Sequence, residues 1–355
     1  MVRKPRLREN AVRPAVDLLS DRVSVGYRLR LNDALRFFEE WLAGRNVLLV
    51  NLIPDIPRLN SELAAYAQHC YDLGIAEWRA RYAILGVQDR CRELKGRLRL
   101  AWDGLFAWRR IEGTRSRLPM RLEVVQAVCH YAVMAALELE PGAYLEWMVF
   151  SVVIRIGFHG LLRPQEIFGL TANAVKLPGP GVFRGLTFGV LAIEEPKNRA
   201  VAARQQVRLL RDAAAVAWLA WLVRELPAKA RLWPFTQACF GRLLKKALTF
   251  LGLESVGFSV GSLRAGGATY LLESGWSVDA IKFAGGWSVE RTLSHYLQEA
   301  EATLTLLSLS PEQVRRVEGA ISLLWPLEHP PGIGLFDLVS RWTLRRQQRC
   351  SHERR

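Results

Sequence analysis

The chain has 355 residues, which is too long for one ordinary domain and is enough for two domains and a tail. Half of the residues are hydrophobic, so a sizeable core can form and a largely disordered chain is excluded. Lys and Arg number 49 against 34 Asp and Glu, which gives a net charge of +15. This balance indicates a polyanionic partner, nucleic acid first and an anionic membrane surface second, with plain solubility as the alternative.

Cysteine and histidine usage predicts neither a disulfide framework nor a metal site. The five cysteines are scattered, odd in number and never in a CxxC pair, as expected of free thiols in a reducing compartment. The six histidines show no metal-ligand spacing, so no metal or other cofactor is expected. The sequence has no uninterrupted run of about 18 apolar residues, so no membrane span is predicted. The basic start MVRKPRLREN lacks the apolar core of a secretory signal, so an intracellular protein is expected.

The N-terminal third is predicted to be a small helical domain. Residues 1–20 are basic and contain proline, as in a loose arm. Apolar residues then recur with helical spacing from Leu31 to Leu42 and from Leu63 to Tyr71, and Gly44 and Gly74 are suitable stops. Two further helices are expected over 77–87 and 98–108. We therefore predict an all-helical domain over 21–112.

A basic stretch accompanies the fourth of these helices. Arg and Lys bind backbone phosphates without reading sequence, so these side chains are candidates for DNA contact. A solvated helix face is the equally weighted alternative. The candidates are Arg97, Arg99, Arg109 and Arg110.

A second, mixed domain is predicted over 121–305, after a linker at 113–120 that has Gly, Ser, Thr and Pro but no apolar period. The β-favouring runs 186–193 and 206–210 flank a basic turn and predict a small β-hairpin or sheet. The remainder is expected to be helical, including a helix over 289–300, and 306–355 is expected to hold one more helix and a basic tail. The fold class predicted is mainly α with a small β element, an α+β protein. The predicted helices of this domain cover 121–137, 143–158, 212–226, 237–251, 262–274, 278–284 and 289–300.

Three segments carry the residue types that phosphodiester cleavage needs: a nucleophile, cations around the phosphate oxygens, and an acid for the departing oxygen. In GLLRPQEIFGL, the Arg-Pro-x-Glu pattern puts Arg163 at a helix start, where the dipole favours an anion. In VGSLRAGGATYLLESG, two glycines that permit close approach follow Arg264. In AGGWSVERTLSHYL, a glycine-rich turn and Trp287 precede Tyr296. Taken singly, such an arginine is more often a surface cap and such a tyrosine is more often core packing.

Together the second and third segments resemble the catalytic boxes of tyrosine recombinases, the family of phage integrases and chromosome-dimer resolvases. That family has an Arg with a Glu three residues later, a hairpin Lys, a His-x-x-Arg box, a His or Trp, and a Tyr nine residues after it. The resemblance covers about 150–300, and the helical N-terminal domain is similar to the family's core-binding domain in size and place. The matching residues are Arg163, Glu166, Lys197, Arg264, Trp287 and Tyr296.

The resemblance implies a role for each matching residue. Tyr296 would attack the scissile phosphate and form a 3′-phosphotyrosyl link, which needs no nucleotide cofactor. Arg163 and Arg264 would hold the non-bridging oxygens, with Glu166 orienting Arg163. Lys197 would act as general acid, and Trp287 would donate its indole N–H or support the pocket. Because hairpin alignments slip easily, the nearby Arg199 and Arg204 are also candidate DNA contacts.

One position departs from the family pattern. The histidine of the His-x-x-Arg box falls on Gly261, which can neither transfer a proton nor bind a phosphate oxygen. Losing such a general base typically costs about 10²–10⁴ in rate. The enzyme would then be slow, or His159 or His295 would substitute, or the protein would be a degraded mobile-element copy that still binds DNA.

Three functions follow from the sequence. The first is DNA recombination or integration, with two domains clamping double-stranded DNA; the resemblance implies that four copies would join two DNA sites. The chain after Ser308 would then pack against a neighbouring copy. The second is a catalytically impaired DNA-binding protein of the same fold, and the third is a helical interaction protein unrelated to DNA. A recombinase would work in the nucleus of a eukaryote or in the cytoplasm and nucleoid of a bacterium.

Overall fold

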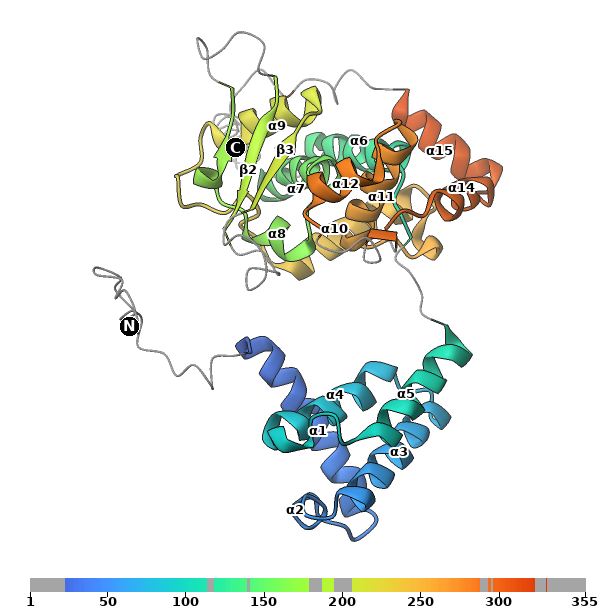
Figure 1. The fold of residues 1–355 in the computed structure, drawn as a ribbon. Coiled ribbons are helices and arrows are strands. Elements are labelled where there is room, and N and C mark those ends of the chain that lie inside the picture. Colours follow the sequence, from blue (N-terminus) through green and yellow to red (C-terminus); the bar gives the residue numbers. More distant parts are fainter. Residues whose placement is uncertain are drawn as a thin grey trace, which may run out of the picture. The chain divides into compact units, whose positions relative to one another are not determined.

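A computed structural model describes residues 23–113, 118–138, 141–178, 187–194, 206–287, 293–294, 296–322 and 330. The chain divides into two compact units, residues 1–115 and 116–355. Each unit has its own hydrophobic core. Most described elements are helices, and the strands form a single small sheet (Figure 1), so the predicted fold class is confirmed.

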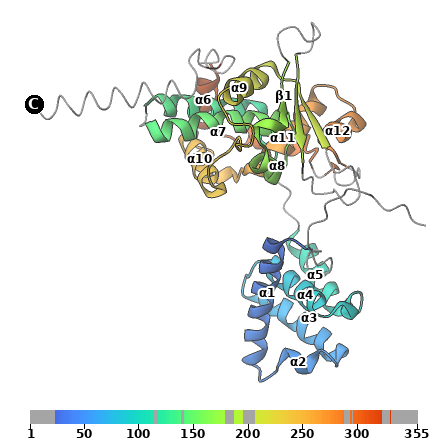
Figure 2. The ribbon, with the colours of Figure 1, turned by 90° about the vertical axis from the view of Figure 1, so that its left-hand side faces the viewer.

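The first unit consists of helices (Figure 2). Its helices α1 and α4 pack together, and α3 packs against both α4 and α5. Gly86 lets α1 and α4 approach closely, because a Cβ there would lie 3.1 Å from the carbonyl oxygen of Leu31. The core between the helices contains Phe38, Tyr66, Ile84 and Trp108. The elements are α1 (Val25–Ala43), α2 (Leu49–Leu52), α3 (Ile56–Asp72), α4 (Glu77–Arg90), a 3₁₀ turn (Arg92–Leu94) and α5 (Arg99–Glu112).

The second unit is built on the long apolar helices α6 (Leu122–Glu138) and α7 (Pro141–His159), which pack side by side. Helices α9 (Ala213–Val223), α10 (Gln237–Phe250) and α11 (Val260–Glu273) pack on this pair. Side-chain caps begin several of these helices. Asp212 accepts from the Ala215 N–H at 2.7 Å and Thr236 from the Cys239 N–H at 3.1 Å.

The sheet is antiparallel, with strand order β1 (Val175–Lys176), β2 (Gly189–Ile193) and β3 (Gln206–Leu210). The two longer strands lie within the predicted runs, while β1 is an addition held by its pairing with Leu191 and Val190. In the β2–β3 ladder Leu191 is opposite Arg208. Leu191 and Leu210 are fully buried, so this face of the sheet belongs to the core.

The chain around Tyr296 differs from its prediction. A continuous helix was expected over 289–300, but Tyr296 lies in a turn and α14 (Glu299–Leu307) begins three residues later. The hydroxyl of Thr269 in α11 donates to the Tyr296 carbonyl at 3.1 Å and accepts from the Gln298 N–H at 3.4 Å. These two hydrogen bonds satisfy the Tyr296 carbonyl and the Gln298 N–H without a helix. The contact with α11 therefore outweighs the helical periodicity of the local sequence.

The last described helix, α15 (Pro311–Ile321), packs on α6 of its own chain. Gln313 donates to the Gly252 carbonyl at 2.5 Å, and Arg316 donates to the Phe250 carbonyl at 3.0 Å. Val317 and Ala320 are buried in the main core of the unit. The helix expected after Ser308 is therefore part of the second unit.

Candidate active site

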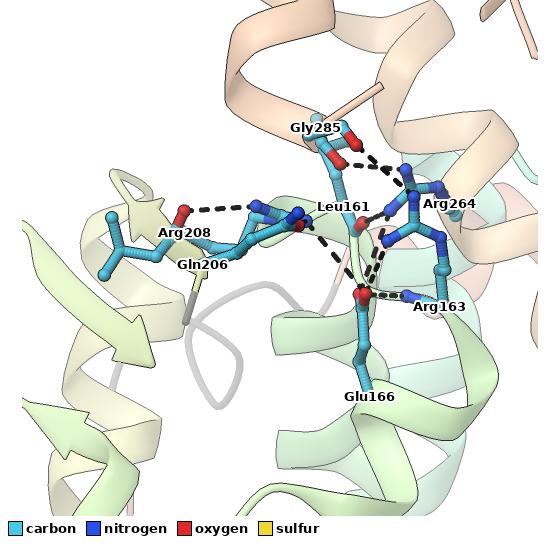
Figure 3. Close-up of polar contacts among 9 residues, drawn as sticks. Leu161, Arg163, Glu166, Gln206, Arg208, Arg264 and Gly285 are labelled. Carbon is cyan, nitrogen blue, oxygen red and sulfur yellow. Dashed lines mark hydrogen bonds and ion pairs between the residues drawn. The ribbon is translucent and has the colours of Figure 1, made fainter. Parts of the chain in front are cut away.

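Four segments that are distant in the sequence meet at one place in the second unit (Figure 3). The turn from α7 into α8 (Pro164–Gly169) contributes Arg163 and Glu166, and α11 contributes Arg264. Strand β3 contributes Arg208. The end of α12 (Val278–Gly285) and the residues after it contribute backbone carbonyls and Trp287. The site thus combines three arginines with a single carboxylate.

Glu166 is the carboxylate that pairs with all three arginines. It is 6% exposed, and its carboxylate accepts from the Arg163 side chain at 2.6 Å and from the Arg163 backbone N–H at 2.8 Å. Arg264 and Arg208 come within 3.9 and 4.0 Å of its two oxygens. Arg163 is the N-cap of α8 and Glu166 is in the first turn, so the Arg-Pro-x-Glu pattern itself creates the closest pair.

Arg264 is 1% exposed and is held by backbone carbonyls and an aromatic ring. Its guanidinium donates to the Leu161 carbonyl and, at 2.9 Å, to the Gly285 carbonyl. The guanidinium carbon lies 3.9 Å from the ring centroid of Trp287, a cation–π geometry. Leu161 has a φ of 50°, unusual for a residue with a side chain, and this conformation belongs to the turn that presents its carbonyl.

The glycines around Arg264 allow this packing. A Cβ at Gly266 would lie 1.8 Å from the Met120 carbonyl oxygen, and one at Gly267 would lie 2.2 Å from that of Phe158. A Cβ at Gly285 would lie 1.7 Å from the Trp287 ring. No side chain fits at these distances, so α11 and the end of α12 approach their neighbours only because these residues are glycines.

Arg208 is a member of the site that sequence reasoning missed. It is 3% exposed and donates to the Gln206 side chain at 2.9 Å and to the Val207 carbonyl at 3.2 Å. One sequence signal could have found it. Gln206, Arg208 and Leu210 alternate on one strand face, and the apolar Leu210 marks that face as buried.

The described side chains of the site leave a surplus of two positive charges, since three guanidinium groups face one carboxylate. Burial lowers the pKa of Arg264 to about 9, with repulsion from Arg163 as the next cause and attraction to Glu166 opposing it. Burial also lowers the pKa of Arg208. A buried positive surplus is costly unless an anion neutralises it, so the site is suited to an anionic ligand.

Tyr296 and Trp287 form the aromatic side of the site. Their ring centroids are 5.3 Å apart at 58°, and the Arg264 guanidinium carbon lies 5.6 Å from the Tyr296 ring. Tyr296 is partly exposed, whereas Trp287 is buried in a small cluster with Leu161, Ile281 and Leu293. A phenol beside an arginine cluster can act as a nucleophile toward a bound phosphoryl group.

Gly261 lies in the first turn of α11 and is buried. His159, a proposed substitute for the missing histidine, has its Nε2 3.8 Å from the Asp212 carboxylate, at the N-terminus of α9. Burial lowers its pKa, with Asp212 opposing and Arg155 reinforcing the shift. His159 is therefore part of the packing between α7 and the start of α9, where it pairs with Asp212. His295, the other proposed substitute, lies outside the described residues, as do Lys197, Arg199 and Arg204.

The remaining predicted contacts belong to the first unit. Arg97, Arg99 and Arg110 are exposed, and no hydrogen bond or ion pair of their guanidinium groups is present among the described residues. Arg109 is different, because its guanidinium donates twice to the Glu77 carboxylate, at 2.8 and 3.1 Å. Three of the four arginines are thus available to a ligand, and Arg109 is engaged within its own unit.

The described part of the chain was also compared with the requirements of metal sites and membrane spans. It has no group of three or more His, Cys, Asp or Glu side chains that could hold a metal ion. None of its helices combines the length and the apolar character needed to cross a lipid bilayer.

Comparisons with known proteins gave similar folds only. No protein-family model matches the chain, and no curated protein sequence matches it. The XerH site-specific recombinase bound to its difH substrate is similar at 16% identity, covering 71% of this chain and 69% of that one, with a TM-score of 0.43. The Tn1549 transposon integrase in complex with transposon right end DNA is similar at 12% identity, over 78% and 99% of the two chains, with a TM-score of 0.46. The XerA recombinase is similar at 14% identity, over 83% and 99%, with a TM-score of 0.37. Because such values carry no argument about function, the function has to be inferred from the chain's own residues.

Proposed function

We propose that this protein cleaves and rejoins DNA strands through a covalent phosphotyrosyl intermediate on Tyr296, as a site-specific recombinase or integrase. One observation carries the proposal: three arginines, of which Arg208 and Arg264 are buried and Arg163 is partly buried, share a single carboxylate beside the Tyr296 ring. A phosphodiester carries one negative charge, and attack by a phenolate raises the charge of the reacting group to two. A fixed surplus of two positive charges matches that transition state better than the ground state, which is the requirement for catalysis.

The chemical step can be written with its atoms in balance. The phenolic oxygen of Tyr296 loses its proton to water or a base and forms a bond to phosphorus, while the bond from phosphorus to the 5′ oxygen breaks. Lys197 gives its proton to the departing 5′ oxygen. Rejoining reverses these steps, with a 5′ hydroxyl attacking the phosphotyrosine. The bond energy is kept in the link, so no nucleotide cofactor is consumed.

Arg163 and Arg264 would bind the non-bridging oxygens, and Glu166 would orient Arg163. Trp287 would hold Arg264 against the phosphate through its ring face. The partner would be double-stranded DNA clamped by both units, with Arg97, Arg99 and Arg110 on phosphates. Exchange between two DNA sites would need four copies of the chain.

A second candidate is a DNA-binding protein of the same fold whose chemistry has lapsed. Gly261 favours it, because no side chain at this position can take the phenolic proton. The arginine cluster opposes it. A protein that only binds the DNA backbone gains little from burying guanidinium groups in excess of carboxylates, since exposed arginines bind phosphates as well.

The test uses purified full-length protein with supercoiled plasmid and measures both relaxation and protein that stays covalently attached to DNA after denaturation. No target sequence is needed if cleavage can occur outside the cognate site. We expect Tyr296→Phe to abolish both signals. Tyr270→Phe is the matched control, since Tyr270 lies in the same unit but packs on Phe158 and His159 outside the site.

Relaxation that persists in Tyr296→Phe would exclude Tyr296 as the nucleophile. If the unmodified protein binds DNA with strong salt dependence and never attaches covalently, the second candidate is favoured. If the protein does not bind DNA at all, both the recombinase and the DNA-binding candidate are ruled out.

A further inference from the structure

Arg208 is placed where a buried cation is hard to explain by stability alone. It lies opposite Leu191 in the β2–β3 ladder and shares the core-facing side of β3 with Leu210. Both leucines are fully buried and Arg208 is 3% exposed. Removing a guanidinium group from water is costly unless close partners compensate its charge and its N–H donors.

The compensation for Arg208 is incomplete. Glu166 is the acidic group within reach among the described residues, at 4.0 Å, and its carboxylate is already held by Arg163 at 2.6 Å. The shorter bonds of Arg208 go to neutral acceptors, the Val207 carbonyl and the Gln206 side chain. Its Nε is buried with no hydrogen-bond partner in the described part of the chain. A positive charge and an N–H donor are therefore left over.

The backbone at Gly286 lies directly against the guanidinium group of Arg208. Gly286 has a φ of 64°, and a Cβ at this residue would lie 2.5 Å from Nη2 and 2.8 Å from Nη1 of Arg208. The Gly286 carbonyl accepts from Arg163 at 3.4 Å, and the Gly285 carbonyl accepts from Arg264 at 2.9 Å. The three arginines therefore converge on one short backbone segment (Figure 3). Arg208 belongs to the same cluster as the two arginines that the sequence motifs identify.

We infer that Arg208 is a third guanidinium that binds the reacting phosphoryl group, and that it supplies the cationic hydrogen-bond donor that Gly261 cannot provide. This inference rests on the proposed cleavage function and deepens it. Arginine does not release its proton near neutral pH, so Arg208 replaces electrostatic stabilisation and not proton transfer. The site would therefore favour a doubly charged phosphoryl transition state while remaining slow in removing the phenolic proton.

Two substitutions and a matched control test this role. Arg208→Met removes the charge while keeping an unbranched, apolar stem of similar length, and Arg208→Lys keeps the charge without the planar fork. Arg155→Met is the control, because Arg155 is equally buried in the same unit but stacks on Trp218, away from the site. Circular dichroism first checks that each variant is folded.

The first readout is the shift in the thermal unfolding midpoint caused by low millimolar sodium sulfate, compared with sodium chloride at equal ionic strength. Sulfate serves as a doubly charged tetrahedral oxyanion. We expect it to stabilise the unmodified protein and Arg155→Met equally, Arg208→Lys less, and Arg208→Met least. Because general exclusion of sulfate from protein surfaces affects all four alike, only site binding produces a difference.

The second readout is covalent attachment to plasmid at saturating DNA. We expect Arg208→Met to slow attachment by about 10²–10³, the usual effect of losing one oxyanion donor, with little change in DNA binding. Arg208→Lys should fall between. If Arg208→Met is unfolded, the lysine variant decides.

The outcomes separate this inference from the proposed function. If the unmodified protein attaches to DNA, then sulfate stabilisation or an attachment rate that is unchanged in Arg208→Met would overturn the role of Arg208 and leave the proposed function intact. Absence of sulfate stabilisation in the unmodified protein would also overturn it. If sulfate stabilisation depends on Arg208 but no DNA is ever attached, the anion site stands and the proposed cleavage function fails.

Discussion

Glu166 is the residue on which the arrangement of the site depends most. Its carboxylate forms ion pairs with Arg163, Arg208 and Arg264, and it is 6% exposed. Removing one partner from a buried ionic cluster destabilises a protein more than replacing the whole cluster by apolar residues, because the remaining charges are left uncompensated. Gly261 is the contrasting residue. A histidine at this position could take the phenolic proton, and a glycine has no side chain to do so.

Restoring the missing group should therefore raise activity. We expect Gly261→His to increase covalent attachment to plasmid by about 10²–10⁴, the usual contribution of a positioned general base. Gly241→His is the matched control, since a Cβ at Gly241 in α10 meets nothing within 4 Å. The measurement is the single-turnover attachment rate. An unchanged rate in folded Gly261→His would mean that proton transfer does not limit the reaction or that another group already performs it.

At the scale of elements, the helices with clear apolar periods and the β2–β3 hairpin could be predicted from the sequence. In both kinds of element the burial of one face imposes a regular spacing of apolar residues. The break at Tyr296 could not, because it depends on the Thr269 hydroxyl, which is 27 residues away along the chain. Strand β1 is two residues long and exists only through its pairing with β2. Arg208 could have been predicted only from the alternating burial of β3, as the charged residue on the buried face of that strand. Motif spacing, by contrast, pointed directly to Arg163, Glu166 and Arg264.

Helix α7 carries a polar stripe through an otherwise apolar element. Ser151, Arg155 and His159 recur every four residues, and all three are buried or nearly so. Arg155 donates to Ser151 at 3.2 Å and stacks on Trp218 of α9, and His159 faces Asp212 at the start of α9. This stripe joins α7 to α9 and ties their packing to the protonation of His159.

The second unit should accordingly lose stability in acid. Burial lowers the pKa of His159 and also of His130, whose Nδ1 is buried without a partner in the described region. A histidine with a lowered pKa in the folded state binds its proton more readily in the unfolded state. The free energy of unfolding therefore falls as pH drops below about 6.5, by up to about 1.4 kcal/mol per pH unit for each histidine.

Urea unfolding monitored by tryptophan fluorescence between pH 7 and pH 5 measures this loss. We expect His159→Gln to show a shallower decline than the unmodified protein, because one of the two titrating groups is removed. Parallel declines would contradict the assignment to His159.

At the scale of the whole molecule, α15 limits how copies of the chain could assemble. It buries Val317 and Ala320 in its own core and bonds to the carbonyls of Gly252 and Phe250. A neighbouring copy can use this helix only by its outer face or by detaching it. A tetramer would therefore have to use the outer face of α15, a detached α15 or other parts of the chain.

The net charge of +15 gives the final prediction, because DNA binding driven by phosphate contacts weakens linearly on a logarithmic salt scale. Each phosphate contact contributes about 0.9 to that slope. Replacing Arg97, Arg99 or Arg110 by Ala should each lower the slope by about that amount, because their guanidinium groups are free of partners in the described region. Arg109→Ala should have a smaller effect, since Arg109 is held by Glu77, and Arg90→Ala is the control because Arg90 pairs with Glu39 at 2.5 Å. Fluorescence anisotropy with a labelled duplex over a range of KCl concentrations measures the slopes. Equal slopes for all five variants and the unmodified protein would remove these arginines from the DNA interface.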